Sequence, residues 1–85
     1  MGNYRISWKE SVRKDILHFP SFIVSRIIRK VETLSSNPMP VGVKKLKNAE
    51  HTYRVRGTDY RIIYQINTTD KEIVICRIRH RKDAY

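Results

Sequence analysis

The hydrophobic and polar positions of the chain follow two different periods, and the changes of period mark the expected elements. Near the N-terminus, residues 3–8 alternate, with Tyr4, Ile6 and Trp8 on one side and polar residues on the other. Successive side chains of a strand point to opposite faces, so this segment predicts a half-buried strand. Trp8 is interpreted as a core residue of that strand.

Two helical segments follow. In residues 9–19, Val12, Ile16 and Phe19 recur at helical spacing, and Pro20 ends the segment because proline cannot continue a helix. Ser21 is the expected cap of a second helix, which ends at the sequence SSNPMP. The apolar stripe of this second helix consists of Ile23, Ile27, Val31 and Leu34, widened by Val24 and Ile28. Both stripes predict core-facing helices.

Residues 37–51 form a long connection. Loops of this length in small domains are often functional or contain a short strand. Lys44, Lys45 and Lys47 make the connection a candidate phosphate contact, and a solvated lysine loop is the equally supported alternative.

Three strands are predicted in close succession, at 52–56, 60–66 and 72–80, and their short links predict an antiparallel meander. Gly57 in the first link is expected to adopt a positive φ. The fold class expected for residues 1–85 is a single α+β domain. It contains an N-terminal strand, two helices, and a three- to four-stranded antiparallel sheet with the helices packed on one face.

Alternation along the meander separates an apolar face from a basic one. Tyr53, Tyr60 and Tyr64 are expected in the core, and in the last strand Cys76 is expected on the helix side, in phase with Val74 and Ile78. The open face is expected to carry Arg54, Arg56, Arg61, Arg77, Arg79 and Arg81. Like charges on neighbouring strands destabilise a sheet, so this cluster indicates an anionic ligand.

Charge and composition support a polyanion as partner. Lys and Arg number 18 against 8 Asp and Glu, a net charge of +10. One cysteine, Cys76, excludes an internal disulfide framework, and with no apolar signal segment it favours a reducing cytoplasm. The apolar runs are too short to span a bilayer, and the basic residues do not form the polar face of an amphipathic helix. No metal-ligand spacing or glycine-rich phosphate loop occurs, so neither a metal nor another cofactor is expected.

The ordered series "YRVRGTDYRIIYQI" and then "RHRKDAY", with "NP" after the second helix and a "KKLK" lead-in, resembles the RelE/ParE superfamily of toxins from toxin–antitoxin pairs. The resemblance extends over nearly the whole chain. RelE-like members cleave mRNA in the ribosomal A site, whereas ParE-like members poison DNA gyrase. The arginine-rich face favours the RelE-like branch, and the resemblance implies an acidic antitoxin that wraps the toxin in a hetero-oligomer.

The resemblance also implies roles for individual residues. Arg54 and Arg56 match two basic sites where the best-known members have lysines, and Arg61 matches a phosphate-binding arginine. Arg81 matches the arginine at the end of the last strand, and Tyr85 matches a terminal tyrosine that stacks on a base. RNA contacts are expected from Lys44, Lys45, Lys47, Arg77, Arg79 and Lys82.

Proton transfer is the step that these residues leave open. Arginine has a pKa above about 12 and accepts protons poorly. His80 is a candidate base, because an unperturbed histidine titrates near pH 6.5; the alternative is that it points toward the helices and only packs there. His18 and His51 are interpreted as incidental. Two further functions stay open, a ParE-like gyrase inhibitor and a non-catalytic basic RNA-binding protein.

Overall fold

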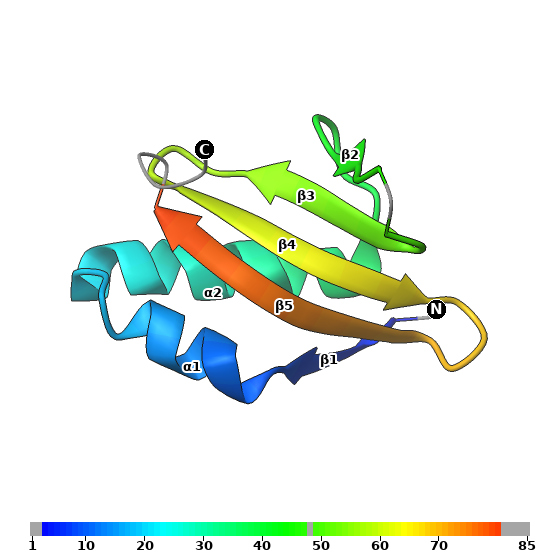
Figure 1. Ribbon diagram of the computed structural model, residues 1–85, viewed down its shortest axis with the longest axis horizontal. Coiled ribbons are helices and arrows are strands. Elements are labelled where there is room, and N and C mark those ends of the chain that lie inside the picture. Colours follow the sequence, from blue (N-terminus) through cyan, green and yellow to red (C-terminus); the bar gives the residue numbers. More distant parts are fainter. Residues whose placement is uncertain (1–2, 48, 81–85) are drawn as a thin grey trace.

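The computed structural model of the protein describes residues 3–47 and 49–80, and it has an α+β fold, as predicted (Figure 1). Along the chain, the elements are β1 (Arg5–Trp8), α1 (Glu10–Ile16), α2 (Ser21–Ser36), β2 (Lys44–Lys45), β3 (Thr52–Arg56), β4 (Tyr60–Asn67) and β5 (Glu72–His80). The strands of this described part form one sheet in the order β1-β5-β4-β3-β2.

The expected antiparallel sheet is confirmed with four strands, and the N-terminal strand adds a fifth strand that makes the whole sheet mixed. β2, β3, β4 and β5 pair antiparallel in sequence order, whereas β1 lies parallel to β5. A parallel neighbour requires a crossover connection, and α1, α2 and the β3–β4 hairpin together form that crossover. β2 is the short strand that a long connection can contain.

The helices take different places. α2 lies across one face of the sheet, whereas α1 follows the edge of β5 beyond the end of β1 (Figure 1). At that edge the backbone N–H of Ile78 donates to Asp15 Oδ2 of α1 at 3.3 Å, so the helix satisfies a group that no strand pairs with.

The core lies between α2, α1 and the covered face of the sheet. Its buried members are Val12, Ile23, Ile27, Val31, Leu34, Val55, Tyr60, Ile62, Tyr64, Ile66, Ile73, Ile75 and Ile78. The predicted stripe of α2 supplies four of them, and Trp8 and Tyr53 pack against them while only partly buried. The tyrosines that are fully in the core use their hydroxyls: Tyr64 donates to Pro38 O at 2.7 Å, and Tyr60 to Arg26 O at 3.4 Å.

Two turn-level expectations were wrong. Pro20, not Ser21, is the N-cap residue of α2, and no side chain caps it. Gly57 is not among the residues with positive φ. Gly57 is required for space instead, because a Cβ there would lie 2.2 Å from Cζ of Tyr60. The hairpin between β3 and β4 therefore depends on the packing of the Tyr60 ring directly against Gly57.

Candidate nucleic-acid interface

The face of the sheet away from α2 carries two rows of basic residues, and strand register defines both. Arg56 pairs with Arg61, which pairs with Arg79, so three arginines lie side by side across three strands. Opposite residues in antiparallel strands have Cβ atoms about 4.5–5.5 Å apart, and their side chains share a face. We call Arg56, Arg61 and Arg79 the arginine row.

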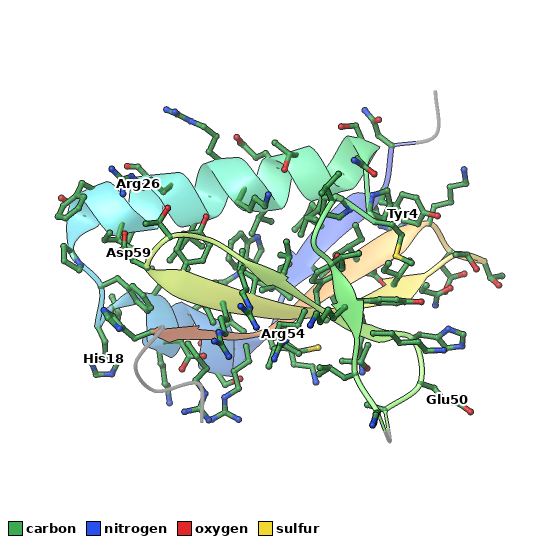
Figure 2. The ribbon with its side chains drawn as sticks, turned by 90° about the horizontal axis from the view of Figure 1, so that it is seen from above. Tyr4, His18, Arg26, Glu50, Arg54 and Asp59 are labelled. Atoms are coloured by element: carbon green, nitrogen blue, oxygen red, sulfur yellow. The ribbon has the colours of Figure 1, made fainter. Side chains whose placement is uncertain are left out.

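A second row lies beside the first. Lys44 pairs with Arg54, Arg54 with Ile63, and Ile63 with Arg77. Arg54 projects on the side of the sheet opposite α2 (Figure 2). We call Lys44, Arg54, Ile63 and Arg77 the mixed row. The two rows are two residues apart along each strand. Together they place six basic side chains close together on one face of the sheet.

Burial differs within these rows. Arg61 is only 5% exposed, whereas Arg56 and Arg77 are exposed. The guanidinium of an arginine stays charged, so the centre of the face holds a desolvated positive charge between two others. Such a site attracts an anion with two adjacent oxygen acceptors, and two oxygens of a phosphate fit the fork of a guanidinium.

A β-bulge gives the arginines of β5 their direction. Ile63 pairs with Arg77 and Tyr64 pairs with Ile75, so Cys76 is the extra residue. Before the bulge Ile73 and Ile75 are buried, and after it Ile78 is buried. An unbroken alternation from Ile75 would have turned Arg77 and Arg79 toward the core. Bulges next to active sites commonly re-aim side chains in this way.

The expected phase of β5 was therefore wrong in its first half. Val74 and Cys76 lie on the open face and are half-buried, whereas Ile78 is on the helix side as predicted. Burial raises the pKa of the Cys76 thiol, so the thiolate is disfavoured at neutral pH. The bulge has no simple signature in an apolar segment, because "IVIC" fits either phase.

His80 lies on the helix side of β5. It pairs with Tyr60, which is buried, and its ring stacks on Phe19 with centroids 5.7 Å apart. This packing against Phe19 agrees with the packing alternative, and a catalytic role for His80 stays a prediction. A cavity of about 210 Å³ beside His80 is lined by Asp15 and His18 and also by Arg79 of the arginine row.

The lysines of the long connection separate. Lys44 belongs to the mixed row, but Lys45 pairs with Tyr53 and so points to the other side. Lys47 follows β2 and is exposed. Arg81, Lys82 and Tyr85 lie outside the described residues, so their proposed roles stay predictions.

Two residues that the sequence did not single out have positive φ, His51 at 56° and Lys71 at 52°. His51 accepts a backbone hydrogen bond from Ile66 at 2.9 Å and lines a cavity on the open face. Its position beside a cavity depends on this turn, which no local sequence pattern indicated.

The described part of the chain lacks two other kinds of feature, a membrane-spanning helix and a metal-binding cluster. No helix there is long and apolar enough to cross a membrane. Among the same residues, no group of three or more His, Cys, Asp or Glu is placed to hold a metal ion.

Comparison with known proteins gives consistent matches. The family described as "ParE toxin of type II toxin-antitoxin system, parDE" matches residues 6–85. Toxin RelE3 of Methanocaldococcus jannaschii is 31% identical over 85 residues, covering 95% of this chain and 94% of that protein.

Two solved structures have the same fold over most of their length. In the archaeal RelE–RelB complex of Pyrococcus horikoshii OT3, a chain matches with a TM-score of 0.84 and 31% identity, covering 96% of this chain and 99% of that one. In the toxin–antitoxin complex RelBE2 of Mycobacterium tuberculosis, the TM-score is 0.83 at 27% identity, covering 93% and 99%.

Proposed function

Because the chain belongs to the RelE/ParE superfamily of type II toxins, we propose that it is a ribosome-dependent endonuclease that cleaves mRNA in the A site of the small subunit and stops translation. The observation that carries the proposal is the pair of basic rows on the uncovered face of the sheet. Like charges side by side on neighbouring strands destabilise a sheet, so these rows favour an anionic ligand such as RNA.

The reaction would be an RNA transesterification. The ribose 2′-OH loses its proton and attacks the adjacent phosphorus, the bond from phosphorus to the 5′ oxygen breaks, and that oxygen takes up a proton. The products are a 2′,3′-cyclic phosphate and a 5′-OH. The phosphorane in between carries extra negative charge, which the arginine row would stabilise. One preorganised donor of this kind contributes about 100- to 1000-fold in rate.

The arginine row would hold the phosphate but not accept the proton, since an arginine does not deprotonate at neutral pH. Lys44 carries an ammonium group on the same face, paired in register with Arg54, and would donate a proton to the leaving 5′ oxygen, while solvent water would take up the proton of the 2′-OH. Tyr85 and Arg81 would complete the site from the C-terminal segment, with Tyr85 stacking on a base. We assign no catalytic role to His80, because it lies on the other face of the sheet.

The partners follow from the surface. The ribosome, which is largely RNA, would explain why the net charge of +10 exceeds what a single phosphate needs. An acidic antitoxin would neutralise the same surface, and the two matched solved structures are a RelE–RelB complex and the toxin–antitoxin complex RelBE2. The toxin would act in the cytoplasm, as one domain, without a cofactor.

Toeprinting of a programmed ribosome with an empty A site tests the proposal. The parent protein should cut within the A-site codon. Arg56→Ala should slow the cut by about 100-fold or more, because it removes an exposed donor of the row without disturbing the core. Arg29→Ala, which removes an equal charge from the exposed surface of α2, is the matched control and should cut like the parent.

A second candidate function is inhibition of DNA gyrase, because the matching family is described as the ParE toxin. Inhibition of gyrase supercoiling by the parent, with no cut in the A-site codon, would replace the leading proposal. Loss of RNA binding in Arg56→Ala, with no cleavage by the parent, would instead indicate the non-catalytic RNA-binding protein.

A further inference from the structure

The open face changes character along its strands. At one end lie the arginine and mixed rows. At the other end, Arg5 pairs with Glu72 and Glu72 with Asn67, and the next row joins Ser7, Val74 and Gln65. Basic side chains therefore dominate one half of the face, whereas the other half carries amide, hydroxyl and carboxylate groups together with Val74 and a single arginine, Arg5.

A cavity lies over this second half. It holds about 480 Å³, within the range of small-ligand sites, and Gln65, Val74, Glu72, Asn67 and His51 line it together with Glu50 and the Thr68–Thr69 turn. The apolar Val74 and Ile66 also line it, so the cavity offers apolar contact beside hydrogen-bond donors and acceptors. Gln65 is two residues along β4 from Ile63 of the mixed row, a separation of about 7 Å. The cavity is thus within one nucleotide's length of the basic rows.

The carboxylate in this cavity is held in place. Ser7 Oγ donates to Glu72 Oε2, and Arg5 Nη2 lies 3.9 Å from the same oxygen. Asn67, by contrast, is engaged within its own turn, where its amide donates to Asp70 Oδ2 at 3.0 Å and its oxygen accepts from Asp70 N at 2.9 Å. Glu72 and Gln65 are therefore the side chains of this cavity best placed to read a ligand.

From this arrangement we infer that the cavity is a nucleobase subsite, which orients one base of the RNA whose phosphate lies on the basic rows. The inference rests on the proposed function for the identity of the RNA. Two carboxylates, Glu72 and Glu50, lie beside the cavity against one arginine, Arg5, so this half of the face attracts a sugar–phosphate backbone much less than the basic rows do. A base does enter it, since single-stranded bases are recognised by hydrogen bonds to their edges and by stacking on residues such as histidine.

The chemistry of the cavity selects among bases. A carboxylate accepts hydrogen bonds, so it favours a base that offers an amino group, as adenine, guanine and cytosine do. Uracil offers a single N–H between two carbonyl oxygens, and those oxygens face the Glu72 carboxylate unfavourably. The Gln65 amide supplies both a donor and an acceptor for the rest of the edge. The subsite therefore discriminates against uridine at one position of the RNA.

The test measures base preference with a set of A-site codons in which each position carries each of the four bases. The parent should cut codons with an amino-bearing base at one position about tenfold faster than the same codons with uridine there. Glu72→Gln, which keeps an acceptor for Ser7 but removes the charge, and Gln65→Leu should each reduce that ratio to about twofold. Glu32→Gln on the exposed surface of α2 is the matched control and should keep the full ratio.

Several outcomes would overturn the inference. Equal slowing of all codons by Glu72→Gln and Gln65→Leu, at an unchanged melting temperature, would mean that the cavity does not read a base. Weaker antitoxin binding by both variants, with an unchanged codon ratio, would make the cavity a protein contact.

A binding measurement without ribosomes tests the base subsite independently of the nuclease proposal. Pentanucleotides of adenosine, cytidine or uridine are titrated into the parent and into Glu72→Gln. The parent should bind the uridine pentamer about tenfold more weakly than the other two, and the variant should bind all three within about twofold. If the parent cuts no codon but shows this order, the subsite stands and the nuclease proposal fails. Equal binding of the three pentamers by the parent overturns the subsite.

Discussion

Deletion of Cys76 tests whether the β-bulge alone sets the direction of the last strand. Ile75 and Arg77 already pair with the adjacent residues Tyr64 and Ile63. Removal of Cys76 should therefore join the two halves of β5 into a regular ladder, with Ile78 still in the core. The lost contacts of one half-buried side chain, about 1 kcal/mol, are offset by a regular ladder hydrogen bond of about 0.5–1.5 kcal/mol. We expect the free energy of unfolding to change by less than about 1 kcal/mol.

Deletion of Val74 is the matched control. It also shortens β5 by one half-buried residue, but it turns Ile75 outward and brings Cys76 into the position that Ile75 fills, where Ile75 is 0% exposed. Loss of a buried isoleucine and the resulting cavity cost about 2–5 kcal/mol. In a chain of 85 residues, each kcal/mol corresponds to about 4–8 °C in melting temperature.

Urea unfolding followed by circular dichroism measures both deletions, and the toeprinting assay measures the consequence for the site. Because bulges increase local strand twist, deletion of Cys76 should leave Arg77 and Arg79 on the open face but shift their positions there, and should slow cleavage by up to about 100-fold while the fold persists. Equal destabilisation by the two deletions would refute the reasoning, because the extra residue would then matter for stability and not for direction.

Three further predictions concern the fold that supports the site. Gly57→Ala should lower the free energy of unfolding by about 1–3 kcal/mol, because its Cβ would lie 2.2 Å from the buried Tyr60 ring. The control Thr58→Ala, in the same exposed turn, should change that free energy by less than about 0.5 kcal/mol, and equal melting temperatures of the two variants in thermal unfolding would contradict the steric argument. Burial raises the pKa of Tyr64 to about 12, so the unfolded chain loses that proton first as pH rises above 10, and the free energy of unfolding falls between pH 10 and 12 by up to about 3 kcal/mol. Tyr64→Phe should lack this part of the decline in urea titrations at several pH values, and an identical slope in both proteins would exclude Tyr64 as its source. Ile27→Ala should lower the free energy of unfolding by about 2–5 kcal/mol and Ile28→Ala by less than about 1 kcal/mol, because the first side chain is 0% exposed and the second 42%. Similar losses in the two variants, measured by urea unfolding, would show that the predicted apolar stripe of α2 does not describe how the helix packs.

Local patterns were sufficient for most of the elements. The stripe of α2 buries Ile23, Ile27, Val31 and Leu34, and β3 and β5 have the predicted bounds. These features depend on side-chain periodicity, which residues near in sequence already determine. Part of the open face could be predicted for the same reason, because Arg54, Arg56 and Arg61 alternate with apolar residues on short strands.

The sequence by itself therefore determined the charge, the elements and the basic side of the hairpin. The tertiary structure decided what depends on partners distant in the chain: the parallel pairing of β1 with β5, the bulge at Cys76, the position of His80 on Phe19, and the cavity between the His51 turn and β5. A strand can place its odd-numbered or its even-numbered residues toward the core. In an apolar segment such as Ile73 to Cys76, both choices bury apolar side chains. Only the pairing of β5 with β4, and the burial of Ile75 and Ile78 on both sides of the bulge, selects the phase that turns Arg77 and Arg79 to the open face.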